Sequence, residues 1–407
     1  MFKDTVFLNI FCFKEVIMNI PIPNHINKIL SLLHSRGHSA YIVGGAVRDA
    51  LLGFKGNDFD ITTSATPEEI KEALSEYKTL DTGIKHGTVT AVSDKGNVEI
   101  TTYRIEGIYS DNRRPDGVEF TRSLCEDLAR RDFTVNALCY NENEGLIDLF
   151  FGKDDLKNKT IRTVGEASLR FSEDALRILR GVRFCAQLGF SAEESTKNAM
   201  HSSFHLLKNI SRERIKTELE KIIIAPYAEN TLSEFCDIIA FSLGAEKSSL
   251  CIEGLSLLPS EGDVRFAFML RKEKEAEKIM KNLKCEKQLT EFVSFVSENI
   301  NFNPESEFEL KKFISYHGYA HTKKLGLIKK AANICGNEKF SLLLDKIECE
   351  KPCLFLKDLD LEGGELLRLG YSGAQIGKAL DFLLEKVMAG EIENSHDKLI
   401  SALQKSI

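Results

Sequence analysis

The chain has 407 residues, too many for one ordinary hydrophobic core, so two to four domains are expected. An apolar fraction of 43% and a charged fraction of 28% are typical of soluble globular proteins, and no apolar run approaches the roughly 20 residues of a membrane helix. The formal net charge of −7 argues against a nucleic-acid partner unless the basic residues are concentrated locally.

The ten cysteines are scattered along the chain. Only Cys349 and Cys353 fall close together, and no histidine lies beside them. This pattern argues against a zinc site and predicts reduced thiols in a cytoplasmic protein. The N-terminal segment is apolar in patches but interrupted by charges, and no small-residue cleavage site follows, so we expect residues 1–24 to be an extension and not a signal peptide.

The stretch AYIVGGAVRDALLG predicts a strand, a turn and a helix. Ala40–Val43 is a short apolar run typical of a buried strand, and Gly44 and Gly45 allow a tight turn. Ala46–Leu52 then has helix formers with an apolar face. The free N–H groups at such a turn attract anions. Arg48 lies in the first turn of this helix, where a cation is unfavourable, and a bound polyphosphate would remove that penalty.

Asp58 and Asp60 follow within the same short span. In an extended segment their carboxylates point to one face, while Phe59 and Ile61 point to the other. Two adjacent carboxylates repel each other unless a cation lies between them, and Mg²⁺ prefers such oxygen ligands. A solvated loop is the usual alternative for an isolated pair of this kind.

Two further strands are expected at Gly87–Val92 and Asn97–Arg104. Glu99 lies on the second strand and is a candidate third acid, although a solvated strand carboxylate is an equally good interpretation. The polar, glycine-bearing segment Glu106–Gly117 predicts a mobile loop.

The string DLARRDFTVNA, residues 127–137, contains two consecutive arginines. A guanidinium offers several donors in a planar fork that suits phosphate and sugar oxygens, so we assign Arg131 to nucleotide contact. Asn136 could orient a ribose or brace the loop.

Residues Phe171–Phe190 have the pattern of one long amphipathic helix. Its polar side carries four charged residues that step round by three: Asp174, Arg177, Arg180 and Arg183. Three arginines without acids four residues further on are poorly paired within the helix, so the stripe is expected to face an anion. A merely solvated helix face is the alternative.

Together these motifs resemble the nucleotidyltransferases of the tRNA CCA-adding and bacterial poly(A) polymerase type. The resemblance rests on GG-x-VRD-x-LLG, D-x-D, E-x-TT-x-R, RRDFT-x-NA and ED-x-x-R-x-x-R-x-x-RF, extends to about residue 225, and is weaker over Asp358–Leu403. It implies an α/β head similar to DNA polymerase beta, with a small mixed sheet and flanking helices, followed by an all-α remainder. The implied domains are a head at 25–152, a helical neck at 153–225, a body at 226–300 and a tRNA-binding tail at 301–407.

The resemblance also implies an activity: template-independent addition of C, C and A to the 3′ end of tRNA from CTP and ATP, with release of pyrophosphate. Asp58 and Asp60 would bind two Mg²⁺ ions roughly 3.5–4 Å apart. The matching positions are Asp58, Asp60 and Glu99 for catalysis, and Gly45, Arg48, Arg131, Asp174, Arg177, Arg180 and Arg183 for the nucleotide.

Within this family an A-adding or CC-adding tRNA enzyme or a poly(A) polymerase would share the same head motifs. A catalytically silent RNA-binding protein on the same scaffold is an alternative of a different class, against which the intact acid pair argues. An antibiotic nucleotidyltransferase would share the acids but not the arginine stripe. The dipeptide His396-Asp397 lacks the further ligands that a phosphohydrolase needs, and we interpret it as chance.

Overall fold

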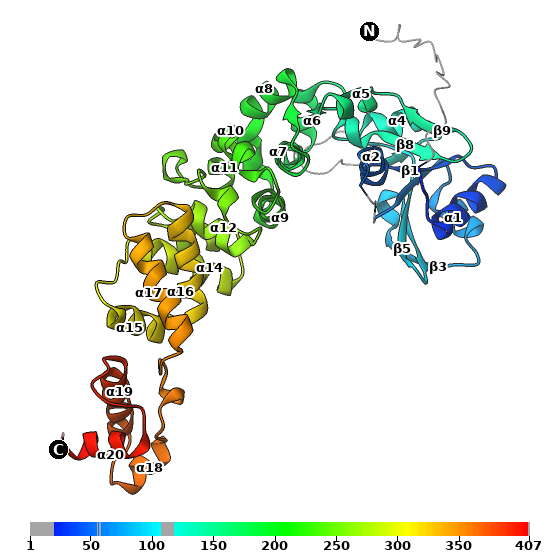
Figure 1. Ribbon diagram of the computed structural model, residues 1–407. Helices are drawn as coiled ribbons and strands as arrows, with labels where there is room; N and C mark the ends of the chain where they lie inside the picture. Colours follow the sequence, from blue (N-terminus) through cyan, green and yellow to red (C-terminus); the bar gives the residue numbers. More distant parts are fainter. Residues whose placement is uncertain (1–19, 55, 57, 107–117, 406–407) are drawn as a thin grey trace. The chain divides into compact units, whose positions relative to one another are not determined.

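The structure is a computed structural model that describes residues 20–405, except 55, 57 and 107–117. It confirms the predicted fold class, because an α/β head is followed by a helical remainder (Figure 1). The chain divides into two compact units, and the division falls between Leu219 and Glu220. Most of the predicted N-terminal extension and of the loop at Glu106–Gly117 lies outside the described residues. The finer division into head, neck, body and tail remains a prediction.

The head is built on a seven-stranded mixed sheet with the order β3-β4-β5-β2-β1-β8-β9. Its strands are β1 (Ala40–Val43), β2 (Asp60–Thr63), β3 (Lys78–Gly83), β4 (Thr88–Ser93), β5 (Gly96–Thr102), β8 (Leu138–Asn141) and β9 (Gly145–Asp148). Only the central neighbours β2 and β5 run parallel, and the other neighbouring pairs are antiparallel. Strands β6 (Arg104–Glu106) and β7 (Val118–Phe120) form a separate antiparallel pair.

Strand β3 was not predicted from the sequence. Its six residues, KTLDTG, combine polar positions with a terminal glycine and occupy an edge of the sheet. An edge strand that is not covered on both faces has little apolar periodicity to reveal it.

Short helices flank this sheet: α1 (Asn24–Ser35), α2 (Gly45–Leu51), α3 (Pro67–Ala73), α4 (Leu124–Ala129) and α5 (Gly152–Lys157). Helix α1 buries Ile26, Ile29, Leu30 and Leu33. The i, i+3, i+4, i+7 spacing of these four residues puts them on one face, which contacts β1 and α3. The predicted strand at Ala40–Val43 is confirmed to the residue, and all four of its residues are buried.

The first unit continues with another two-stranded sheet, β10 (Thr160–Ile161) and β11 (Ser191–Ala192), and with α6 (Ala167–Glu173), α7 (Leu176–Leu188) and α8 (Glu194–Ser203). Helix α9 (Arg212–Ile223) begins in this unit and continues past Leu219 into the second. The prediction of one unbroken helix over Phe171–Phe190 was wrong. The backbone leaves helical geometry at Asp174, with φ −132° and ψ 103°, and the Asp174 carboxylate accepts a hydrogen bond from the Leu176 N–H at 3.0 Å. Aspartate caps a helix start better than it continues a helix, so α6 and α7 are separate.

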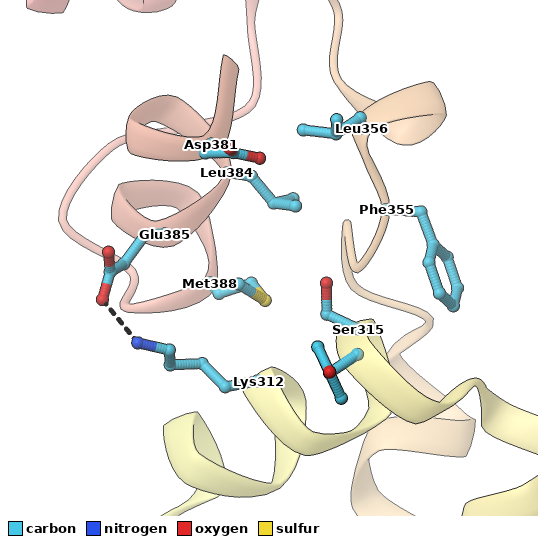
Figure 2. A pocket seen from close by; sticks show the side chains of 9 residues that line it. Lys312, Ser315, Phe355, Leu356, Asp381, Leu384, Glu385 and Met388 are labelled. Carbon is cyan, nitrogen blue, oxygen red and sulfur yellow. Dashed lines mark hydrogen bonds and ion pairs between the residues drawn. The ribbon is translucent and has the colours of Figure 1, made fainter. Parts of the chain in front are cut away.

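The second unit is helical throughout its described part: α10 (Ala228–Glu234), α11 (Cys236–Leu243), α12 (Gly262–Met269), α13 (Ala276–Asn282), α14 (Lys287–Asn299), α15 (Glu307–His317), α16 (Tyr319–Ala331), α17 (Asn337–Glu350), α18 (Gly363–Arg368), α19 (Ala374–Met388) and α20 (His396–Lys405). A cleft of about 460 Å³ lies between α15 and α19 (Figure 2). The ion pair of Lys312 with Glu385, at 2.8 Å, bridges these two helices. None of the helices in the described ranges is long and apolar enough to cross a membrane.

Arg265 on α12 is buried, and its guanidinium is hydrogen-bonded to the backbone. Its guanidinium donates to four backbone carbonyls, those of Ile223, Ala225, Leu258 and Pro259, at 2.9–3.2 Å. Two of these carbonyls belong to the end of α9 and the residues after it, where helical carbonyls have no intrahelical partner. Arg265 therefore ties the start of the second unit to α12.

We predict that Arg265→Met destabilises the protein by about 2–4 kcal/mol, because four backbone carbonyls lose the hydrogen bonds that Arg265 donates. The free energy of unfolding from urea titrations measures this. Arg271→Met is the matched control: Arg271 is similarly buried and close by in the sequence, but it donates to the carbonyl of Phe268, its own near neighbour along the chain. Equal losses for the two variants would contradict the assignment.

Candidate active site

Three carboxylates gather where β2 and β5 run side by side. Asp60 opens β2, and Ile61 pairs with Ile100 of β5, so the parallel register sets Glu99 beside Asp60. Asp58 lies two residues before Asp60, and all three side chains are exposed. Asp60 and Glu99 therefore share one edge of the sheet, as the predicted alternation requires.

The charge of this cluster affects the pKa of Asp60. Desolvation by the surrounding protein raises the pKa of the Asp60 carboxyl most. The negative charges of Glu99 and Asp58 also raise this pKa, while Arg131 opposes the shift. Asp60 thus lies close enough to the other two carboxylates to be repelled by them, and Arg131 lies within electrostatic reach of Asp60.

Both glycines lie at the start of α2, and Gly44 is the one that needs to be glycine. Gly44 has φ 75° and ψ −128°, a conformation that side chains rarely adopt. A side chain on Gly44 would also begin 3.5 Å from Nη1 of Arg131, and one on Gly45 would begin 3.7 Å from Nη2 of Arg48. The turn therefore lies directly against two arginine side chains.

Arg48 is already balanced within the protein. Its Nε and Nη2 donate to Oδ1 of Asp49 at 2.8 and 2.7 Å, and its Nη1 donates to Oδ1 of Asn136 at 2.8 Å. The next residue in the sequence, Asp49, thus already supplies a negative charge to this cation, and binding of a polyphosphate at Arg48 remains a prediction. Asn136 braces Arg48 directly.

A fully buried carboxylate, Asp127, organises the arginine pair. It accepts hydrogen bonds from Nε and Nη2 of Arg130 at 3.0 and 2.7 Å, and from Nη2 of Arg131 at 3.4 Å. It also accepts from Oγ1 of Thr62 on β2 and from the Arg104 N–H. Burial opposes ionisation, but the two arginines outweigh it and lower the pKa of Asp127.

The sequence analysis missed Asp127. The available signal was its spacing, because an acid three and four residues before two arginines lies on their side of a helix.

Asp132 is a second buried carboxylate, and it accepts hydrogen bonds from an arginine of α7. Its carboxylate is buried and accepts from Nε and Nη2 of Arg180 at 2.7 and 2.5 Å and from Nδ2 of Asn136 at 3.2 Å. Burial raises the pKa of Asp132, but Arg180 and the bond from Asn136 prevail and hold it at about 2. An unbroken path of contacts therefore runs from Arg48 through Asn136 and Asp132 to Arg180.

The arginines of α7 have no acid four residues further on, as the sequence indicated, but each has a carboxylate partner of the protein itself. Arg177 pairs with Glu173 at 2.6 Å, Arg180 with Asp132, and Arg183 with Glu218 at 2.6 Å. The acids come from α6, the α4 region and α9, and the helix-only pattern could not reveal the last two.

Asp174 and Arg177 stay adjacent but have separate partners. Oδ2 of Asp174 accepts from Arg214 at 2.9 Å, whereas Nη2 of Arg177 donates to the Arg130 carbonyl at 3.0 Å. The structure thus brings predicted residues into two groups. One contains the three acids and Arg131, and the other contains the charged residues of α7, two of which contact Arg130 and Asp132.

The oxygen ligands of Asp58 and Asp60, with Glu99 beside them, are of the kind that a hard divalent cation prefers. Within the described residues, no group of three or more His, Cys, Asp or Glu side chains is arranged to hold a metal ion by itself. An ion bound by Asp58 and Asp60 would therefore need further oxygen ligands, which a phosphate group or water can supply.

We predict that Asp60→Asn raises the melting temperature of the metal-free protein slightly at pH 7. The pKa of Asp60 in the folded protein lies above its unfolded value of 3.8. Protonation of the carboxyl below pH 3.8 therefore favours the folded state, and this contribution to the free energy of unfolding is lost as pH rises and the carboxyl ionises. The neutral amide removes the loss, and its advantage over the unmodified protein should vanish below about pH 3.

Thermal melts in a chelator at several pH values measure this effect. Asp81→Asn is the control, because that exposed acid pairs with Lys71 at 2.7 Å and its loss should leave the melting temperature unchanged or lower. A lower melting temperature for Asp60→Asn at pH 7 would contradict the repulsion inferred at the cluster.

Three family models match successive parts of the chain. Residues 40–162 match the Poly A polymerase head domain, residues 189–238 match the RNA and SrmB-binding site of polymerase A, and residues 264–403 match tRNA nucleotidyltransferase domain 2. The first match contains the acid cluster, the glycine turn and the arginine pair.

The chain is also similar to CCA-adding enzymes over nearly its whole length. It is 38% identical over 385 residues to the CCA-adding enzyme of Leuconostoc citreum, covering 91% of this chain and 93% of that one. It is 34% identical over 401 residues to the CCA-adding enzyme of Streptococcus thermophilus, covering 94% and 98%.

Solved structures agree in fold. The CCA-adding enzyme of Bacillus stearothermophilus in complex with CTP superposes with a TM-score of 0.77 at 29% identity, covering 94% of this chain and 96% of that chain. The Thermotoga maritima enzyme in complex with tRNA gives a TM-score of 0.70 at 21% identity, over 96% and 98%. With these matches spanning both units, the chain belongs to the nucleotidyltransferase family of the CCA-adding enzymes.

Proposed function

We propose that this protein adds C, C and A to the 3′ end of tRNA, using CTP and ATP and releasing pyrophosphate. The observation that carries the proposal is the acid cluster of Asp58, Asp60 and Glu99, set within electrostatic reach of Arg131 and beside the glycine turn. The relatives that cover more than nine-tenths of this chain are CCA-adding enzymes, which favours this reaction over others that the head could perform.

Asp58 and Asp60 would hold Mg²⁺, two ions in the proposed mechanism, with Glu99 beside them. Bound Mg²⁺ supplies a Lewis acid that makes the RNA 3′-hydroxyl more acidic and offsets the charge of the triphosphate. By fixing the position of the cation, the carboxylates would orient the reacting oxygens. Their mutual repulsion in the free protein is relieved on binding, so part of the affinity for the cation comes from the fold itself.

The glycine turn and the arginines behind it would receive the triphosphate. Arg48 is held by Asp49 and Asn136, so its remaining hydrogen-bonding capacity points in a fixed direction. Arg131 has a buried Nε–H without an acceptor in the structure, which leaves a donor for a nucleotide oxygen. Donors that are already positioned lose little entropy on binding.

Asp174 and Arg177 would choose the base. Cytosine and adenine each present an amine donor next to a ring-nitrogen acceptor, whereas uracil and guanine present the opposite pattern. An ionised carboxylate only accepts and a guanidinium only donates, so this pair matches the first two bases. The Asp174 carboxylate already accepts from Leu176 and Arg214, but its two oxygens have capacity for one more donor.

The proposed reaction is tested by incubating the protein with tRNAs that end before the first C, after C and after CC, in the presence of all four nucleotides. Sequencing of the products should show CCA restored on each. Addition of A alone or of CC alone would identify a partner enzyme, and continued A addition would identify a poly(A) polymerase. No extension with retained tRNA binding would identify a silent RNA-binding protein.

We predict that Asp58→Ala and Asp60→Ala each lower nucleotide transfer by at least about 100-fold, because each removes charge stabilisation at the reacting phosphate. Single-turnover rates at saturating tRNA measure this. Both variants should still bind tRNA, and Asp81→Ala, on the edge strand β3, should transfer normally. Transfer near the unmodified rate in either acid variant would rule out the metal assignment.

We predict that Asp174→Ala erodes the preference for CTP and ATP over UTP and GTP by about tenfold or more, since a polar base contact of this kind contributes ~1–3 kcal/mol. The measurement is kcat/KM for all four nucleotides on matched tRNA ends. Glu218→Gln, which alters the partner of Arg183 on the same helix, should lower activity without changing the preference. Full preference in Asp174→Ala would mean that Asp174 serves only to cap α7 and to bind Arg214.

A further inference from the structure

Three guanidinium groups surround one aromatic ring in the first unit. Cζ of Arg183 lies 4.2 Å from the centroid of the Phe184 ring, Cζ of Arg48 lies 5.2 Å from it, and Cζ of Arg180 lies 5.7 Å from it. All three distances are within the roughly 6 Å over which a ring attracts a cation. Phe184 is 4% exposed, so these contacts are largely shielded from water.

The three arginines come from both sides of the candidate site. Arg180 and Arg183 lie on α7, as Phe184 does, and Arg48 reaches the ring from α2. The Phe184 ring also packs against Phe133 in a T-shaped arrangement, with the ring centroids 5.6 Å apart and an interplanar angle of 80°. Phe184 is therefore a fixed contact shared by the helix after the glycine turn and the helix that follows Asp174.

Ion pairs alone do not explain this arrangement. Each arginine has its own carboxylate partner, and the three carboxylates lie on different segments from one another: Asp49, Asp132 and Glu218. Those pairs neutralise the charges. The path through Asn136 and Asp132 also links Arg48 to Arg180, but the pair of Arg183 with Glu218 does not involve Arg48, and like charges favour separation. The negative face of the ring offers an attraction that the cations share, which opposes that separation.

We propose that Phe184 is a positioning residue for the incoming nucleotide, and that the attraction of its ring for Arg48, Arg180 and Arg183 sets the distance between the triphosphate side and the base side of the site. The proposal rests on the proposed function, because it needs Arg48 and α7 to contact one nucleotide. The hydrogen-bonded path from Arg48 through Asn136 and Asp132 to Arg180 runs alongside the ring and gives the same segments their orientation.

The test replaces Phe184 in the full chain by 4-fluoro-, 3,5-difluoro- and 3,4,5-trifluorophenylalanine. Fluorine withdraws electron density from the ring face and changes its size little, so it weakens cation attraction while the packing stays. We expect KM for CTP and ATP to rise step by step, to about tenfold with three fluorines, the size of a desolvated cation–π contact. KM for tRNA should stay constant, and kcat should change less than the nucleotide KM.

The same substitutions at Phe171, a fully buried ring on α6, control for the effect of fluorine on the core. Phe184→Leu, which removes the ring, should raise nucleotide KM at least as far as three fluorines do. Unchanged nucleotide KM across the fluorine series would overturn the proposal even if Phe184→Leu is impaired, because only packing would then matter.

Calorimetric binding of CTP in the presence of Mg²⁺ provides a readout that does not depend on transfer. If the unmodified protein binds CTP but extends no tRNA, the proposed function fails while a graded loss of CTP affinity still supports the role of the ring. If extension is normal and CTP affinity ignores fluorine, the ring proposal fails alone.

Discussion

The buried carboxylates of Asp127 and Asp132 hold the candidate site together. They stand five residues apart in one motif, with Arg130 and Arg131 between them. Asp127 faces the sheet, where it binds Thr62 on the strand of Asp60, and Asp132 faces α7, where it binds Arg180. Removing one partner of a buried ion pair costs about 3–5 kcal/mol, so the motif forms a strong joint between the sheet and α7.

This joint explains how a chain with a net charge of −7 tolerates a cluster of arginines in one place. Every arginine of the cluster that reaches the glycine turn or α7 has a carboxylate partner nearby, and several of these carboxylates are buried. The cluster therefore needs no bound polyanion to fold. Nucleotide binding can instead draw on donors that the carboxylates leave available and oriented.

The acid cluster shows the opposite design. Asp58, Asp60 and Glu99 are exposed at their edge of the sheet, and the charges of Glu99 and Asp58 add to the desolvation that raises the pKa of Asp60. Charged groups that destabilise the free protein are typical of sites shaped for a ligand. The protein thus compensates charge within the joint and leaves it uncompensated at the edge of β2 and β5, where a cation would bind.

The local motifs by themselves determined the strand at Ala40–Val43, the glycine turn, the acid pair and the α/β head with a helical remainder, because each depends on residues close in sequence. Periodicity places Glu99 on the exposed face of its strand, but only the parallel register of β2 and β5 sets it beside Asp60. The break at Asp174 could not be foreseen from amphipathic spacing, since the apolar positions continue through it while the carboxylate caps α7.

The partners of the α7 arginines were decided by tertiary structure alone. Asp132 and Glu218 are 48 and 35 residues away from Arg180 and Arg183, and a helical pattern has no access to residues at that separation. The same holds for Phe184, whose contact with Arg48 joins residues from two helices with most of the head between them. A sequence specifies which charges are present, but their compensation depends on through-space distance, which only the folded chain provides.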